Sequence, residues 1–195
     1  MRTYPAADRN KDAIAQVLKL WLASSTRVLE IATGTGQHIA YFAEQLAPNI
    51  IWQPSEYTED LLTDILARTH LYSNVLRPIQ LDVESQSWPI GKFDVVYTAN
   101  LLHISPSSCS SALFAGAAHT LKQDGQLIIY GPFMEHGKHN SEGNQTFDSQ
   151  LKQQSDQWGI RDIDWLAELA HLNAFKFTEQ IAMPANNRLL RFTKK

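Results

Sequence analysis

The chain has 195 residues and a formal net charge of −3, and its lysines and arginines are scattered along its length. A chain of this size can bury about 70% of the surface that its unfolded form exposes, which is enough for one domain over residues 1–195. Because no basic stripe is present to neutralise phosphates, nucleic acid is not an expected partner.

Charged side chains occupy much of the first twelve residues, so these residues do not form the apolar region of a signal peptide. No apolar run approaches the roughly 18 residues that cross a bilayer, and no membrane partner is expected. The single cysteine, Cys109, lies in a serine-rich stretch and cannot form an intramolecular disulfide, which fits a reducing compartment. We therefore expect a cytoplasmic protein.

Three segments carry apolar residues at helical spacing. The first includes Ile14, Leu18 and Trp21 and predicts an amphipathic helix over residues 11–23. The second includes Ile39 and ends before Pro48, which cannot donate a hydrogen bond to a continuing helix. The third covers residues 61–66.

Short apolar runs alternate with these helical segments and predict strands. They cover residues 27–32, 50–53, 76–81, 93–98 and 126–130. Repeated strand–helix–strand units require right-handed crossovers, which build a parallel sheet with helices on both faces. The pattern therefore predicts an α/β, doubly wound, Rossmann-like fold.

The end of the chain departs from that pattern. Residues 175–183 and 188–193 are strand-like, and the link of four residues between them is too short for a crossover helix. These two strands must therefore be antiparallel. The result is a sheet of seven strands that is mainly parallel and whose last strand is antiparallel.

A glycine-containing turn follows the first predicted strand, in the sequence Val-Leu-Glu-Ile-Ala-Thr-Gly-Thr-Gly over residues 28–36. Glycine lets the backbone approach a ligand closely, and ligands of such sheets bind at the carboxyl ends of the strands. The alternative is an ordinary strand-to-helix turn with a capping threonine. A dinucleotide-binding turn would have a third glycine where Ile39 stands, and a P-loop would have a Gly-Lys-Ser/Thr sequence that is absent here.

The turn and the terminal hairpin together resemble class I S-adenosylmethionine (SAM)-dependent methyltransferases, whose motif is E/D-x-G-x-G-x-G. Glu30 matches the acid, Gly34 and Gly36 match the later glycines, and Ala32 replaces the first glycine. That replacement is tolerable if the position needs small size rather than a positive φ. The resemblance implies SAM as the cofactor, with Glu30, Ala32, Thr33, Gly34 and Gly36 among the residues that bind it.

Three polar positions after the second, third and fourth strands extend the resemblance. Glu56 ends the second strand and matches the acid that binds the ribose hydroxyls, although it also suits the start of a solvated helix. Asp82 and Val83 match the positions that bind adenine. Asn100 follows the fourth strand. In the family, the loop at this place faces the methionine part of SAM and the methyl acceptor.

Two residues near the carboxyl ends are catalytic candidates. His103 is a candidate general base, because a histidine can accept a proton at neutral pH. The equally weighted alternative is that it packs at the start of a helix. Tyr130 ends the fifth strand and is the other candidate if the acceptor is a hydroxyl or a carbon. An amine or thiolate acceptor would need no strong base.

Residues 131–159 form a polar connection that is longer than a normal strand-to-helix link. It has a short helical core near Phe147 and Leu151 and is expected to form a lid over the ligand, the alternative being a disordered surface loop. His136 and His139 lie in it without cysteines or paired carboxylates nearby, so we expect them to be solvated and predict no metal site.

Several segments in combination resemble a narrower group, the SAM-methyltransferase-like family called domain of unknown function 938, which includes methyltransferase-like 26. They cover residues 5–10, 29–36 with His38, 52–55, 100–104, 130–133, 147–148, 158–162 and 183–187. Most members have Asp where this chain has Glu56. The resemblance implies that the pocket is bordered by Arg9, Asn10, His38, Tyr130, Asn186 and Asn187. Asn186 and Asn187 also suit the turn of the hairpin.

The leading functional hypothesis is methyl transfer from SAM to a small molecule, in which the protein chiefly aligns donor and acceptor. The alternative is a protein that binds SAM or S-adenosylhomocysteine without methyltransferase activity. An NAD-dependent oxidoreductase is disfavoured by Ile39 and the terminal hairpin. The sequence leaves open whether the protein is a monomer or a homodimer.

Overall fold

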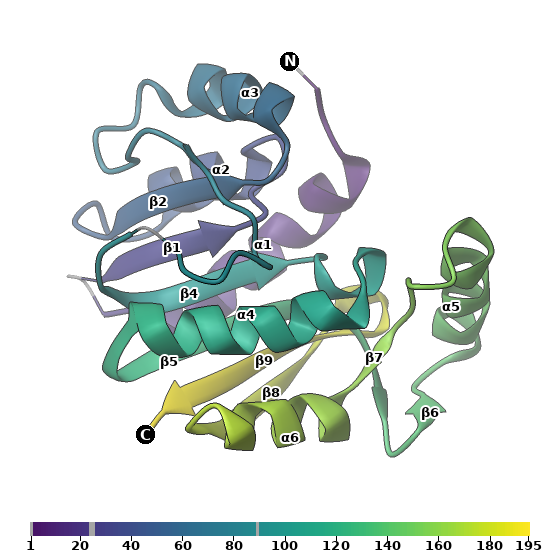
Figure 1. Ribbon diagram of the computed structural model, residues 1–195. Coiled ribbons are helices and arrows are strands. Elements are labelled where there is room, and N and C mark those ends of the chain that lie inside the picture. Colours follow the sequence, from purple (N-terminus) through teal and green to yellow (C-terminus); the bar gives the residue numbers. More distant parts are fainter. Residues whose placement is uncertain (1, 24–25, 89) are drawn as a thin grey trace.

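A mixed sheet runs through the middle of the molecule in the computed structural model, which describes residues 2–23, 26–88 and 90–195. Within these residues, seven strands lie side by side in the order β3-β2-β1-β4-β5-β9-β8 (Figure 1). They are β1 (Arg27–Ile31), β2 (Ile51–Glu56), β3 (Ile79–Gln80), β4 (Phe93–Ala99), β5 (Leu121–Glu135), β8 (Phe175–Met183) and β9 (Asn187–Lys194). The first five pair in parallel, and β9 is antiparallel to both β5 and β8. The predicted mainly parallel, doubly wound sheet is confirmed.

Helices cover both faces of the sheet. In Figure 1, α1 and α2 lie behind the sheet, whereas α4 and α6 lie in front of it. The helices are α1 (Pro5–Trp21), α2 (Gln37–Gln45), α3 (Glu59–Thr69), α4 (Ser107–Thr120), α5 (Glu142–Gln154) and α6 (Ile163–Leu172). Successive strand residues point to opposite faces, so Val28 joins the core under α1 and α2 while Leu29 joins the core under α4 and α6.

Helix α1 begins six residues earlier than its apolar stripe predicts. Pro5 stands at its first positions, where the missing N–H costs nothing, and the chain remains helical as far as Trp21. The stripe of Ile14 and Leu18 packs into the core. The first two turns carry no such stripe because they face a cleft rather than the core.

Two strands differ most in length from the predicted ones. β3 is reduced to Ile79–Gln80, because Pro78 has no N–H to donate to a neighbouring strand. β5 begins at Leu121, five residues before its predicted start, and extends beyond Tyr130 to Glu135. Its last three residues pair with two short strands, β6 (Lys138–His139) and β7 (Arg161–Asp162). The fifth strand therefore leads directly into the predicted lid.

The polar connection after Tyr130 is ordered and contains α5. This helix stands apart from the sheet on the side toward which β1 and β4 point (Figure 1). Ser141 caps its start by accepting a hydrogen bond from the backbone N–H of Asn144. Among the residues that the structure describes, no helix is long and apolar enough to cross a membrane.

Candidate active site

A cleft of about 1480 Å³ opens at the carboxyl ends of the parallel strands. Its lining includes residues that follow β1, β2, β3 and β4, together with the first turns of α1 and one face of α5. Ligand pockets commonly measure about 300–1,000 Å³. The cleft is therefore large enough for two molecules at once.

The turn after β1 shows why its first glycine position matters. Ala32 lies in the cleft wall with φ 55°, in the left-handed region where a Cβ is strained. The condition under which alanine replaces glycine without cost is therefore not met, because the position needs a positive φ as well as small size. Thr33 and Gly34 also line the cleft, and Gly34 has φ 63°.

Replacing Ala32 with glycine is expected to stabilise the protein by up to about 1 kcal/mol, because relief of the left-handed strain outweighs the added flexibility of the unfolded chain. Thermal unfolding should show a melting temperature about 2–4 °C higher. Ala13→Gly, in the middle of α1, is the matched control and should lower it. An Ala32→Gly variant that melts below the parent protein would contradict this account of the turn.

Two residues expected in the cofactor site lie beneath the cleft instead. Gly36 does not line it; this residue caps the start of α2 with φ 80°, and an added Cβ would lie 3.2 Å from Cα of Ile65. It is therefore required for close packing of α2 against α3. Glu30 also lies outside the lining and is 2% exposed, with Oε2 unpaired among the described residues.

Burial changes the ionisation of Glu30. Desolvation raises its pKa from 4.5 to about 8, and the negative charge of Glu56 adds to that rise, while a hydrogen bond with Thr33 opposes it. At neutral pH the group is therefore mostly a neutral carboxylic acid.

Glu56 joins the second strand to the glycine turn. Its Oε2 accepts a hydrogen bond from the backbone N–H of Gly34 at 2.8 Å, and its Oε1 accepts from those of Tyr57 and Thr58 at 2.9 and 3.1 Å. A carboxylate has about four acceptor positions. Glu56 lines the cleft and retains an acceptor position for a ligand hydroxyl.

Asp82 and Val83 lie in the cleft wall after β3. Oδ1 of Asp82 accepts a hydrogen bond from the backbone N–H of Glu84 at 2.9 Å, which fixes the turn and leaves Oδ2 for a ligand amino group. Val83 is 8% exposed. On the next strand, Asn100 lines the cleft with φ 60°, and its N–H donates to the carbonyl of Tyr130.

A buried polar cluster closes the floor of the cleft between α1, α2 and β5. Asn10 and His38 are each 7% exposed and joined by a bond of 2.6 Å between Oδ1 and Nε2. The side chains of Asn10 and Asn187 hydrogen-bond to the hydroxyl of Tyr130. Burial raises the pKa of Tyr130 and lowers that of His38 from 6.5 to about 4, so both are uncharged at neutral pH.

Arg9, one residue before this cluster, is exposed at the edge of the cleft. It has no ion pair among the residues that the structure describes. Its guanidinium group is thus free to face a bound anion.

His103 lies in the cleft on the short helix η1 (Leu102–Ile104) and is 7% exposed. Burial, with a smaller contribution from the charge of Arg161, lowers its pKa from 6.5 to about 4. The sequence-based prediction assumed an ordinary imidazole pKa. The buried ring is uncharged at neutral pH, but it is a much weaker base than that prediction assumed.

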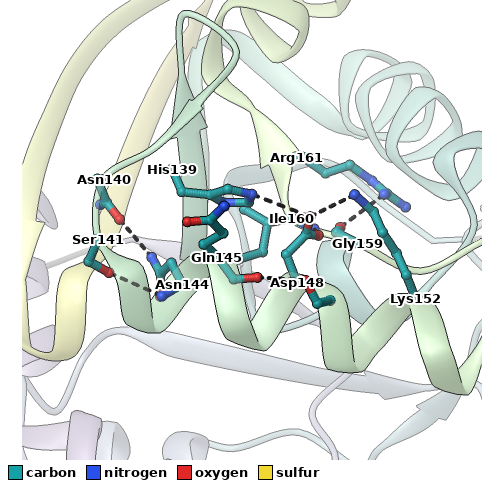
Figure 2. A network of polar contacts seen from close by, with 11 residues as sticks. His139, Asn140, Ser141, Asn144, Gln145, Asp148, Lys152, Gly159, Ile160 and Arg161 are labelled. Atoms are coloured by element: carbon teal, nitrogen blue, oxygen red, sulfur yellow. Dashed lines mark hydrogen bonds and ion pairs between the residues drawn. The ribbon is translucent and has the colours of Figure 1, made fainter.

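A network of polar contacts joins α5 to the segments before and after it in the chain (Figure 2). At its centre is Asp148, 3% exposed, whose Oδ1 accepts a hydrogen bond from the backbone N–H of Ile160 at 2.7 Å. Its Oδ2 lies 2.6 Å from Nζ of Lys152 and 3.4 Å from Nε2 of His139. Burial acts to raise the pKa of Asp148, but its partners lower it below the ordinary value.

His139 is thus largely buried, whereas it was expected to be solvated. His136 is exposed and pairs with Asp164 at 2.8 Å. Within the described part of the chain, no three histidine, cysteine or acidic side chains are grouped to hold a metal ion.

The start of α5 is tied to the turn of the terminal hairpin. Nδ2 of Asn144 donates to Oδ1 of Asn140 at 2.7 Å and to the carbonyl of Asn186 at 3.1 Å. Asn186 itself has φ 57° and is not part of the cleft lining, whereas Asn187 is. Asn186 therefore forms the turn, and Asn187 faces the cleft.

Asp148→Asn is expected to loosen α5 by about 1–3 kcal/mol, since the buried carboxylate loses its charge toward Lys152 and His139. Hydrogen exchange should become faster in α5, with β1 and β4 unchanged. The exposed Asp156→Asn is the matched control. Unchanged exchange in α5 would show that the network does not hold the helix.

Several cleft residues were not predicted from the sequence. Tyr4 is one: its backbone N–H donates to Oε1 of Gln37 at 2.5 Å, and its ring covers Gly34. Asn144 and Phe147 are others, both on α5. The helical core of the lid was recognised at Phe147, but no local pattern indicates which of its side chains face the cleft.

The chain matches a known protein family and resembles solved structures. A sequence model of the family described as "Protein of unknown function (DUF938)" matches residues 1–194. The structure is similar to that of an O-methyltransferase family 2 protein from Planctomyces limnophilus in complex with apigenin, with a TM-score of 0.81 and 15% identity over 97% of this chain and 58% of that chain.

Two further solved structures are similar. One is CalO1, a methyltransferase in calicheamicin biosynthesis, in its SAH-bound form, with a TM-score of 0.78 and 11% identity over 97% of this chain and 54% of that chain. The other is the S-adenosylmethionine-dependent methyltransferase SibL in its apo form, with a TM-score of 0.79 and 14% identity over 96% of this chain and 55% of that chain. This chain spans a little over half the length of these proteins. At such identities the likeness establishes a shared fold, which alone does not select a chemistry.

Proposed function

Because the chain belongs to the DUF938 family and has the Rossmann-like fold of methyltransferases, we propose that it binds SAM and transfers the methyl group to a small molecule. One observation supports this most strongly. Glu56 is hydrogen-bonded to Gly34, so the acid at the end of β2 meets the glycine turn inside a cleft that has room for a second molecule.

The residues in the cleft fit SAM. The free acceptor position of Glu56 suits a ribose hydroxyl, and Oδ2 of Asp82 suits the adenine amino group. Gly34 has no Cβ, so its backbone can lie close to a ligand in the cleft. Asn100 lines the part of the cleft next to Tyr130. When bound, SAM supplies a methyl group activated by its sulfonium charge, which passes to the acceptor as S-adenosylhomocysteine and a proton are released.

The chain's own contribution is alignment more than proton removal. His103 and Tyr130 are both uncharged at neutral pH, and the low pKa of His103 makes it a weak base. Catalysis by orientation needs no strong base when the acceptor is itself a good nucleophile. The same weak base favours a second candidate function, a protein that binds SAM or S-adenosylhomocysteine without transferring the methyl group.

Calorimetric titration with SAM and with S-adenosylhomocysteine tests the cofactor site, with NAD as the control ligand. We expect both adenosyl ligands to bind and NAD not to bind. A folded protein that binds neither would refute the proposal. An assay for transfer of a radiolabelled methyl group from SAM to a panel of small molecules then distinguishes an active methyltransferase from a protein that binds the cofactor without activity.

A further inference from the structure

The part of the cleft beyond the cofactor residues has an aromatic corner. The rings of His103 and Phe147 meet edge to face, with centroids 5.5 Å apart and an interplanar angle of 64°. Phe147 is 37% exposed and lines the cleft together with Pro132 and Pro184. Two rings at such an angle give a planar ligand one face and one edge to pack against.

The hydrogen-bonding group beside this corner is an acceptor. Asn144 is 7% exposed, and both N–H groups of its amide are directed to Asn140 and Asn186. Among the described residues, its Oδ1 has no hydrogen-bond partner. A molecule in this part of the cleft therefore has a carbonyl oxygen available that suits a hydroxyl donor.

The part of the cleft around the corner has no carboxylate in its described lining. The acidic residues in the cleft wall are Glu56, which ends β2, and Asp82 and Glu84, which follow β3. No carboxylate lines the cleft in the later described segments, from residue 99 onward. Arg9 stands at the edge without an ion pair, and Arg161 lies behind the corner, where it donates to the carbonyl of Ser105 at 2.6 Å.

Resting on the proposed function, we propose that the methyl acceptor is an aromatic hydroxyl compound without positive charge. Its ring packs in the corner of Phe147 and His103, and a hydroxyl group donates to Oδ1 of Asn144 in the bound state. For transfer, the hydroxyl would lose its proton to solvent; the phenolate oxygen would then form the new O–CH3 bond as the S–CH3 bond of SAM breaks and S-adenosylhomocysteine leaves. A cation at this place would lie near Arg161 and the sulfonium of the cofactor. Asp148, the carboxylate next to Phe147 in α5, is already paired with Lys152, so the desolvation of the cation would not be compensated.

Three probes that share a phenol ring test the charge preference in protein saturated with S-adenosylhomocysteine. They are 4-ethylphenol, which is neutral, 3-(4-hydroxyphenyl)propionate, an anion, and tyramine, a cation. Calorimetry should give dissociation constants for the first two that are at least tenfold lower than for tyramine. A fourth probe, 4-ethylanisole, cannot donate a hydrogen bond and should bind at least fivefold more weakly than 4-ethylphenol.

Phe147→Ala should weaken binding of 4-ethylphenol at least tenfold while leaving the affinity for S-adenosylhomocysteine within twofold. Gln150→Ala, an exposed position on the same helix, is the matched control and should change neither. The inference is overturned if S-adenosylhomocysteine binds but tyramine equals the other probes, or if Phe147→Ala has no effect. Absence of S-adenosylhomocysteine binding by the folded protein overturns the proposed function, and this inference with it.

Discussion

Replacing Glu56 with alanine is expected to weaken SAM binding by about 10- to 100-fold, or about 1.4–2.8 kcal/mol. The carboxylate serves two purposes: it offers an acceptor to the ligand, and it accepts hydrogen bonds from the N–H groups of Gly34, Tyr57 and Thr58. The variant loses both, so the glycine turn also loses its anchor to β2. Calorimetric titration with SAM measures the effect.

Two variants separate the contributions. Glu56→Asp keeps the charge but draws it back by one methylene, so SAM affinity should fall only a few-fold. Glu59→Ala removes an exposed carboxylate three residues later and should leave SAM affinity within twofold. Equal SAM affinity in Glu56→Ala and in the unmodified protein would remove Glu56 from the cofactor site.

Glu30→Gln is expected to change how stability depends on pH. The folded pKa of Glu30, about 8, lies above its ordinary value of 4.5. Its contribution to folding is therefore fully present below pH 4.5 and is lost as the pH rises through about 8. Between these pH values, the free energy of unfolding of the variant should rise relative to that of the unmodified protein by about 1.4 kcal/mol per pH unit. The difference should reach a few kcal/mol at the alkaline end.

The buried histidines act in the opposite direction. The folded pKa of both His38 and His103 is about 4, below the ordinary 6.5, so their contribution is present above pH 6.5 and is lost as the pH falls toward 4. The unmodified protein should thus be most stable near pH 6.5. Urea unfolding from pH 5 to 8 measures the loss of stability on the acidic side and on the alkaline side of this maximum. The exposed Glu168→Gln variant is the control. A Glu30→Gln variant that tracks the unmodified protein at every pH would show that Glu30 is ionised in the folded state.

The architecture could be predicted from the sequence because it depends on local patterns. The apolar runs that form β1 and β4 are short and separated by helical stripes, and the link of the terminal hairpin is too short for any other arrangement. Helix α4 was not predicted, since serine and alanine fill Ser107–Thr120 and obscure its buried face. The first turns of α1 were missed because they face the cleft and lack an apolar stripe.

The site was predictable only in part. The residues at the strand ends follow from the topology, and most of them line the cleft. Contacts between distant residues are different: Tyr4 meets Gln37 from 33 positions away, and Asn144 meets Asn186 from 42 positions away. Burial could not be predicted either, and it is burial that lowers the pKa of His103 and raises that of Glu30. A pKa depends on the assembled surroundings of a group and not on its neighbours in the chain.

The place of β9 between β5 and β8 has a consequence for the order of assembly. Strand β8 is made earlier, yet among the described residues it pairs with β9 alone, so it cannot join the sheet until β9 has inserted beside β5. Asn187, at the start of that strand, hydrogen-bonds to Tyr130, which in turn meets Asn10 from α1. During synthesis the hydrogen bond between Asn187 and Tyr130 is thus absent until β9 has joined β5, so the floor of the cleft is completed later than the glycine turn and the end of β2.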